Sequence, residues 1–133
     1  MQKSTGVNMS EHERLNQANQ FIKVIATCGR QFLSHDGFIS FMELSQTKRV
    51  FFVDYYTRKS IYTHRKYVVW RGFTAGGTMK SLIEALRDFI KTGKLLRLSY
   101  FQDNMGNGFK NPWGYGEDLA IVKNAAQRLG IAE

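Results

Sequence analysis

The sequence predicts one α+β domain in which about three helices pack on one face of a four- to five-stranded antiparallel meander sheet. Three observations carry this prediction. Apolar residues recur at helical spacing in both halves of the chain, residues 49–56 are dense in β-branched and aromatic side chains, and only short turns divide residues 31–66. A length of 133 residues suits a single domain. We expect it to span residues 10–133, after a flexible polar tail over residues 1–9.

The first helix is expected at about residues 11–28. Ser10 and Glu13 make the Ser-x-x-Glu pattern of a capping box, which satisfies free amides at a helix start. Apolar residues then follow at spacings of three or four, which indicates an amphipathic helix with one buried stripe. Gly29 can adopt the left-handed conformation that ends a helix.

Four strands are expected next. Residues 31–35 and 38–44 flank Asp36-Gly37, the pair best suited to a two-residue hairpin turn with positive φ angles. Residues 49–56 are rich in β-branched and aromatic side chains, and a fourth strand over residues 60–66 follows a short turn. Because no helix separates these strands, we expect an antiparallel meander.

Two more helices follow the strands. Apolar residues at 79, 82, 83, 86, 89 and 90 form one helical face, with Thr78 as N-cap and Gly93 as C-terminal stop. A fifth strand or extended segment is expected at residues 95–101, and the last helix at about residues 117–129. Between them, residues 102–116 are rich in Gly and Asn and form a loop.

The charge pattern favours a negatively charged partner. The formal net charge is +8, and residues 57–71 hold five Lys or Arg side chains, one His and no acidic side chain. A basic excess attracts nucleic acid or an acidic protein surface. No apolar run approaches the ~20 residues of a membrane-spanning helix, so we expect no membrane partner. The single cysteine, Cys28, suits a reducing compartment, and we expect a cytoplasmic protein.

The same stretch interleaves cations with aromatic rings. Alternate side chains of a strand share a face, so Tyr62, His64 and Lys66 are expected together on one side. Cations neutralise phosphates and rings stack on bases, which predicts a nucleic-acid surface without base-specific readout. Its expected residues are Arg58, Lys59, Tyr62, His64, Arg65, Lys66, Tyr67, Trp70 and Arg71. Two other interpretations stay open: a protein-binding surface, and an ordinary hairpin whose rings cover the sheet while basic side chains reach solvent.

Two further segments are candidate binding sites. One is a helix start whose free amides attract anions, although the full P-loop pattern is absent and a plain strand-to-helix turn explains the same residues. Its residues are Gly76, Gly77, Thr78 and Lys80. The other is the glycine-rich loop, whose rings bind a partner if exposed or cover the sheet as a lid if buried. Its rings belong to Phe109, Trp113 and Tyr115.

No pattern in the sequence predicts a catalytic residue, a metal site or a cofactor. The three histidines lack the spacing of zinc ligands, and no nucleophile-elbow motif is present. Glu43 and Asp54 lie on neighbouring expected strands, where paired acids can hold a divalent metal, but no third ligand joins them. If Phe51, Val53 and Tyr55 face the helices, Asp54 faces the opposite side. We therefore expect a protein that is not an enzyme.

Several motifs resemble those of small hypothetical proteins from proteobacterial prophages and other mobile elements. The motifs are Ile61-Tyr62-Thr63-His64, Trp70-Arg71-Gly72-Phe73-Thr74, Gly76-Gly77-Thr78, the positions Leu82, Leu86 and Gly93, and Trp113-Gly114-Tyr115-Gly116. The resemblance covers roughly residues 11–130. It implies a phage or plasmid accessory protein, of a kind that often binds DNA or blocks a host defence enzyme by protein contact. That family carries no assigned activity, so no functional residue is transferred.

Two functions are therefore expected from the sequence. The first is a phage accessory protein that binds nucleic acid, largely non-specifically, through the basic aromatic sheet surface. The alternative is a protein-binding inhibitor or adaptor that uses the same basic surface or the aromatic loop. A monomer and a homodimer both stay open, because Phe21, Phe38 and Phe41 are more than one core needs and suit a dimer face.

Overall fold

The computed structural model describes residues 9–28, 33–55, 58–64, 78–97 and 117–133. These residues form three helices and two antiparallel sheets, which confirms the α+β class predicted from the sequence. The helices are α1 (Glu11–Thr27), α2 (Thr78–Thr92) and α3 (Glu117–Arg128). The strands are β1 (Ser34–His35), β2 (Phe38–Ile39), β3 (Phe41–Leu44), β4 (Val50–Asp54) and β5 (Lys59–Tyr62).

The start of α1 follows the predicted cap. Ser10 Oγ accepts a hydrogen bond from the Glu13 amide at 3.2 Å, and the Ser10 hydroxyl donates to Glu13 Oε1 at 3.2 Å. Met9, the last residue of the expected tail, is only 6% exposed and belongs to the core. Phe21 is fully buried, so its assignment to a dimer face is wrong: it lies on the apolar stripe that packs inward.

Glycines end the other two helices. Gly93 follows α2 with a φ of 78°, as predicted, and Gly130 follows α3 with a φ of 75°. Thr78 is the first residue of α2 rather than its N-cap, a difference of one residue at a helix boundary. In the expected strand at 95–101, Leu96 makes an isolated parallel bridge with Ala132, and residues 98–101 lie outside the described residues.

The strands divide between two sheets rather than one. β1 and β2 form a hairpin whose turn, Asp36-Gly37, has φ values of 52° and 82°, as predicted. β3, β4 and β5 form an antiparallel meander. The prediction of a single sheet is wrong, because the chain changes its hydrogen-bonding partner strand at Ser40. Its amide donates to Leu33 O at 2.9 Å, while its Oγ accepts from the Tyr55 amide at 3.0 Å.

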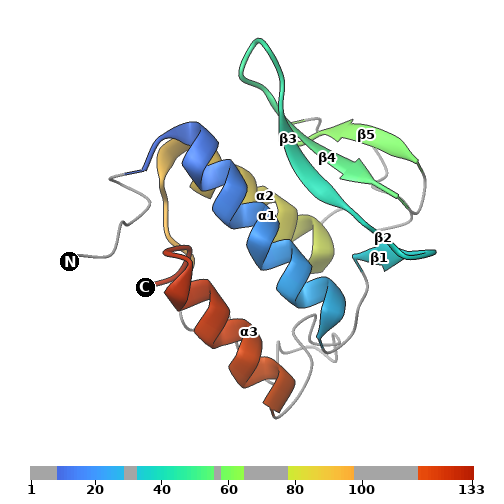
Figure 1. Ribbon diagram of the computed structural model, residues 1–133. Helices are drawn as coiled ribbons and strands as arrows, with labels where there is room; N and C mark the ends of the chain where they lie inside the picture. Colours follow the sequence, from blue (N-terminus) through green and yellow to red (C-terminus); the bar gives the residue numbers. More distant parts are fainter. Residues whose placement is uncertain (1–8, 29–32, 56–57, 65–77, 98–116) are drawn as a thin grey trace.

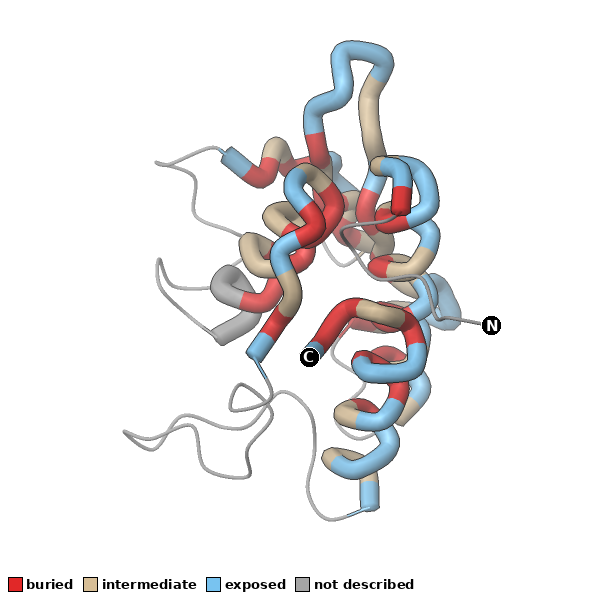
Figure 2. Tube along the Cα trace, turned by 90° about the vertical axis from the view of Figure 1, so that its left-hand side faces the viewer, coloured by how far each residue is buried: buried red, intermediate tan, exposed pale blue. Residues whose placement is uncertain are grey.

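The helices and the three-stranded sheet lie in layers (Figure 1). α1 packs against α2, and these two helices contact β3 and β4 respectively, so both lie on one side of the sheet. α3 packs on α1 instead of on the sheet. Buried residues lie along the facing sides of the helices, with exposed residues on their outer sides (Figure 2). The largest fully buried side chains include Phe21, Phe52, Phe89, Leu82 and Leu86.

Candidate nucleic-acid interface

The two faces of the three-stranded sheet differ sharply in burial. Along β4, Val50, Phe52 and Asp54 are buried. The residues that alternate with them, Phe51, Val53 and Tyr55, are half-buried. This alternation places Phe52 toward the helices and the half-buried set on the other side. The orientation considered from the sequence, with Phe51 and Tyr55 toward the helices, is therefore wrong. Phe52, rather than Phe51, places its ring in the core.

The face directed away from the helices is called the outer face here. Strand register groups its residues into rows: Phe41, Val53 and Ser60 form one row, and Glu43, Phe51 and Tyr62 form the next. Directly opposed side chains on one face of an antiparallel pair lie within contact distance. The outer face thus gathers aromatic side chains from all three strands. Its residues are Phe41, Glu43, Phe51, Val53, Tyr55, Ser60 and Tyr62.

The rings of the outer face form two clusters. In the first, the Tyr55 ring stacks on Phe38 of the β1–β2 hairpin, with centroids 5.2 Å apart and planes at 23°. Phe41 is tilted against the same Tyr55 ring at 6.1 Å. The side chain of Phe38 is 56% exposed, so this cluster presents an aromatic surface to solvent.

Tyr62 is the centre of the second cluster. Its ring centroid lies 5.3 Å from that of Phe51 and 5.6 Å from that of His64. The guanidinium carbon of Arg49 lies 5.6 Å from the Tyr62 centroid, within the range of a cation–π contact. The predicted shared face of Tyr62 and His64 is confirmed, whereas Thr63 is buried on the other side. The Phe51 ring is tilted against Tyr62 at 36°, and the His64 ring meets it edge-on at 61°, so Arg49 places a positive charge beside a group of non-parallel rings.

His64 is biased toward its neutral form. Desolvation lowers the pKa of the imidazole, and the positive charge of Arg87 lowers it further, against the raising effect of Asp88 and Glu84. Arg87 lies close because its Nη1 donates to Thr63 O at 2.9 Å. At neutral pH, His64 therefore contributes an uncharged aromatic ring to the outer face and no positive charge.

Of the predicted cations, only Arg58 and Lys59 are described, and neither belongs to the rows of the outer face. Arg58 is exposed in the β4–β5 turn, where its φ is 58°. Lys59 is exposed, but it pairs in register with Asp54 and so projects from the helix side of the sheet. The remaining predicted residues, Arg65, Lys66, Tyr67, Trp70 and Arg71, lie outside the described residues.

The acidic residues do not form a metal site in the described part of the chain. Glu43 is exposed on the outer face, whereas Asp54 is fully buried on the helix side, so the two carboxylates point to opposite sides of the sheet. Among the described residues, no group of three or more His, Cys, Asp or Glu side chains could hold a metal ion. Cys28 is half-buried, and its Sγ lies 3.3 Å from Asp118 Oδ1.

The other two predicted segments fall mostly outside the described residues. Gly76 and Gly77 lie there, as does the whole aromatic loop with Phe109, Trp113 and Tyr115. Thr78 and Lys80 belong to the first turn of α2. Anion binding at this helix start and partner binding by the loop stay predictions.

Sequence reasoning missed Arg49, Phe51 and Tyr55 as members of the candidate interface. A signal was present: Phe51, Val53 and Tyr55 alternate with a second apolar set in the same strand. When both alternating sets of a strand are apolar, one of them must lie on the less buried face. The sequence alone does not say which set that is.

The comparisons with known proteins place the chain in a family. Its sequence matches the YoqU family over residues 8–133. The chain belongs to the YoqU family. One member, the SPbeta prophage-derived uncharacterized protein YoqU of Bacillus subtilis (strain 168), is 29% identical over 128 residues, which cover 95% of this chain and 88% of the relative. No solved structure matches the chain.

Membership of the YoqU family agrees with the expected resemblance at the level of a phage-derived protein. The proteobacterial origin that the resemblance implied is not shown, because the YoqU relative comes from a Bacillus prophage. Within the described residues, no helix has the length and apolar character needed to cross a bilayer.

Proposed function

We propose that this YoqU-family protein is a phage accessory protein that binds nucleic acid, largely without sequence preference, through the outer face. The observation that carries the proposal is the pair of ring clusters on the side of the sheet opposite the helices. Stacking of a base on an aromatic side chain contributes about 1–3 kcal/mol and tolerates any base. An interface of this kind needs no base-specific hydrogen bonds.

Positive charge supports the same proposal. Arg49 lies over the Tyr62 ring, and Arg58 is exposed at the end of the β4–β5 hairpin. Three more cations, Arg65, Lys66 and Arg71, follow β5 in the sequence. Together with a net charge of +8, these residues favour a polyanionic ligand over a neutral one.

The proposal includes a non-enzymatic role and a cytoplasmic location. Opposite placement of Glu43 and Asp54 argues against a shared metal at these two acids. Two of the described titratable groups close to the outer face are His64, which favours its neutral form, and Glu43, which is exposed. A single thiol in the chain suits a reducing compartment, which supports the cytoplasm.

Binding measurements with short DNA at several salt concentrations test the proposal. If about four phosphates are neutralised, the slope of log K against log salt on duplex DNA is close to −3.6. Tyr62→Leu keeps an apolar side chain but removes the stacking ring, and we expect about a tenfold loss of affinity for DNA. Arg128→Gln on α3, away from the sheet, is the control and should change affinity little. Absence of DNA binding at low salt overturns the proposal.

One observation favours the alternative, a protein-binding inhibitor or adaptor. Glu43 is an exposed carboxylate on the outer face, where it repels phosphates but can pair with a basic side chain of a protein, and Phe38, which is 56% exposed, suits an interface anchor. A pull-down from a bacterial host tests this function with two double variants. One is Arg65→Glu with Lys66→Glu, and the other is Trp113→Ala with Tyr115→Ala. Retention of every partner by both variants contradicts the alternative.

A further inference from the structure

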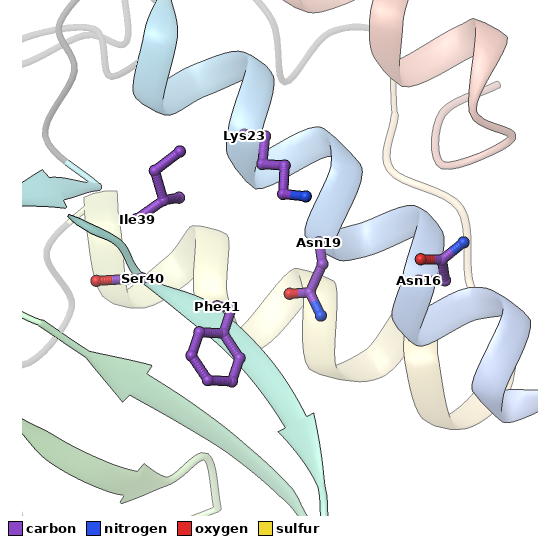
Figure 3. Close-up of a pocket in the computed structure, with 6 residues that line it drawn as sticks. All are labelled: Asn16, Asn19, Lys23, Ile39, Ser40 and Phe41. Atoms are coloured by element: carbon purple, nitrogen blue, oxygen red, sulfur yellow. The ribbon is translucent and has the colours of Figure 1, made fainter. Parts of the chain in front are cut away.

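A groove adjoins the outer face at the edge of β3 (Figure 3). It has a volume of about 310 Å³ and lies between α1 and the junction of β2 with β3. Phe41 lines the groove and also contacts Tyr55 of the first ring cluster, so the groove and the outer face share a residue. The lining residues are Asn16, Asn19, Lys23, Ile39, Ser40 and Phe41.

Two of the polar residues in the groove are committed to the fold. Asn19 Nδ2 donates to Met42 O at 2.9 Å, and Asn19 Oδ1 accepts from the Met42 amide at 2.6 Å. The Oγ atom of Ser40 accepts from the Tyr55 amide at 3.0 Å. These contacts join α1, β3 and β4 and hold the walls of the groove in place.

The other two polar residues are available to a ligand. Within the described part of the chain, the side chains of Asn16 and Lys23 make no hydrogen bond or ion pair with the protein, and both residues are exposed. Among the described residues that line the groove, none is acidic. Asn16 and Lys23 lie about two turns apart on α1, so a side-chain amide and an ammonium group line the same groove, and both can donate hydrogen bonds to an anion.

We propose that this groove binds one phosphate of a single-stranded nucleic acid whose neighbouring bases stack on the outer face. The proposal rests on the proposed function and adds the path of the strand: it crosses the edge of β3 at Phe41 and reaches Lys23. A volume of about 310 Å³ is at the lower end of small-ligand sites, so the groove has room for about one nucleotide. Single strands also expose the base faces that a duplex hides.

The test uses a fluorescent oligothymidylate of roughly 12 nucleotides, within the site sizes of small single-strand binders. Lys23→Gln removes one phosphate contact, so the salt slope falls in magnitude by about 0.7 and affinity falls about five- to tenfold at low salt. Asn16→Asp introduces a negative charge and lowers affinity at least as much. Lys94→Gln is the matched control, because Lys94 is exposed after α2 and does not line the groove.

The outcomes separate the two proposals. A duplex competitor of the same length should displace the oligothymidylate poorly from the wild-type protein. If the wild type binds but Lys23→Gln and Asn16→Asp match Lys94→Gln, the groove assignment is wrong while the outer face stands. Equal competition by duplex also overturns the single-strand path. If the wild type binds neither probe, both proposals fail.

Discussion

Arg14 is a cation on the buried stripe of α1, and its guanidinium bonds to the end of another helix. The side chain donates to Ile90 O at 2.8 Å and to Lys91 O at 3.4 Å, and it also donates to Met9 O. The last carbonyls of a helix lack intrahelical partners and carry partial negative charge. Arg14 therefore satisfies the C-terminal end of α2 while it is only 8% exposed itself.

Replacement of this buried cation should cost considerable stability. We expect Arg14→Met to lower the free energy of unfolding by about 2–4 kcal/mol, because the carbonyls at Ile90 and Lys91 lose a charged donor inside the protein. Urea unfolding followed by circular dichroism measures the change. Arg97→Met, at an exposed position after α2, is the control and should stay within about 0.5 kcal/mol of wild type. Equal effects of both changes would contradict this role for Arg14.

Glu11 forms a pH-dependent contact between the same two helices. Its Oε2 accepts from Lys91 Nζ at 2.7 Å, and that hydrogen bond holds the pKa of the carboxyl below its usual range despite some desolvation. A carboxyl group whose pKa is lower in the folded state stabilises the fold at pH values above its unfolded-state pKa. This stabilisation is lost as the pH falls through the folded-state pKa.

The stability gap between wild type and Glu11→Gln should therefore depend on pH in the acidic range. Both partners are partly exposed, so we expect a gap of about 0.5–1 kcal/mol at neutral pH. It should shrink as pH falls below the ordinary glutamate pKa and vanish once Glu11 is protonated in the folded state. Urea unfolding of both proteins across this range measures it. A gap that is constant with pH excludes an ionised Glu11 contact.

Among the elements, β3 is an edge strand that α1 protects. Asn19 bonds to both the amide and the carbonyl of Met42, the groups that point away from β4. An unpaired strand edge invites pairing with another chain. The Asn19 amide takes the place of a neighbouring strand at this position, so α1 both covers the sheet and closes its edge.

Loss of the Asn19 side chain should leave two backbone groups of Met42 without partners. We expect Asn19→Ala to reduce the free energy of unfolding by about 1–3 kcal/mol and to increase self-association through the exposed edge. Asn16→Ala, one turn earlier on the same helix, is the matched control and should change stability little. Thermal unfolding with light scattering reports both effects. A stable, monomeric Asn19→Ala protein argues against the edge-closing role.

Local signals predicted the helices and the tight turn, but not how the strands divide. Asp36-Gly37 and Gly93 could be predicted because positive φ angles favour such residues directly. The switch of partners at Ser40 depends on Leu33 on one side and on Tyr55, 15 residues further along the chain, on the other, so no local pattern indicates it. The burial of Arg14 was also not predicted, although its spacing from Ala18 and Phe21 places it on the apolar stripe of α1.

Across the whole molecule, helices occupy one side of the three-stranded sheet and aromatic clusters the other. The shared face of Tyr62 and His64 could be predicted from strand alternation. The contributions of Phe51 and Tyr55 could not, because the direction of β4 depends on which of its two apolar sets meets α2. This arrangement supports the proposal of a sheet surface that stacks on bases, with the groove at Lys23 as its extension.

An NMR titration of the isotopically labelled protein with oligothymidylate tests the proposed interface most directly. The account predicts that the amide and ring signals of Phe51, Tyr55 and Tyr62 shift in a concentration-dependent way, while the signals of α3 stay in place. Shifts confined to α3, or unchanged signals across β3, β4 and β5 at saturating oligonucleotide, would contradict the outer face as the nucleic-acid surface.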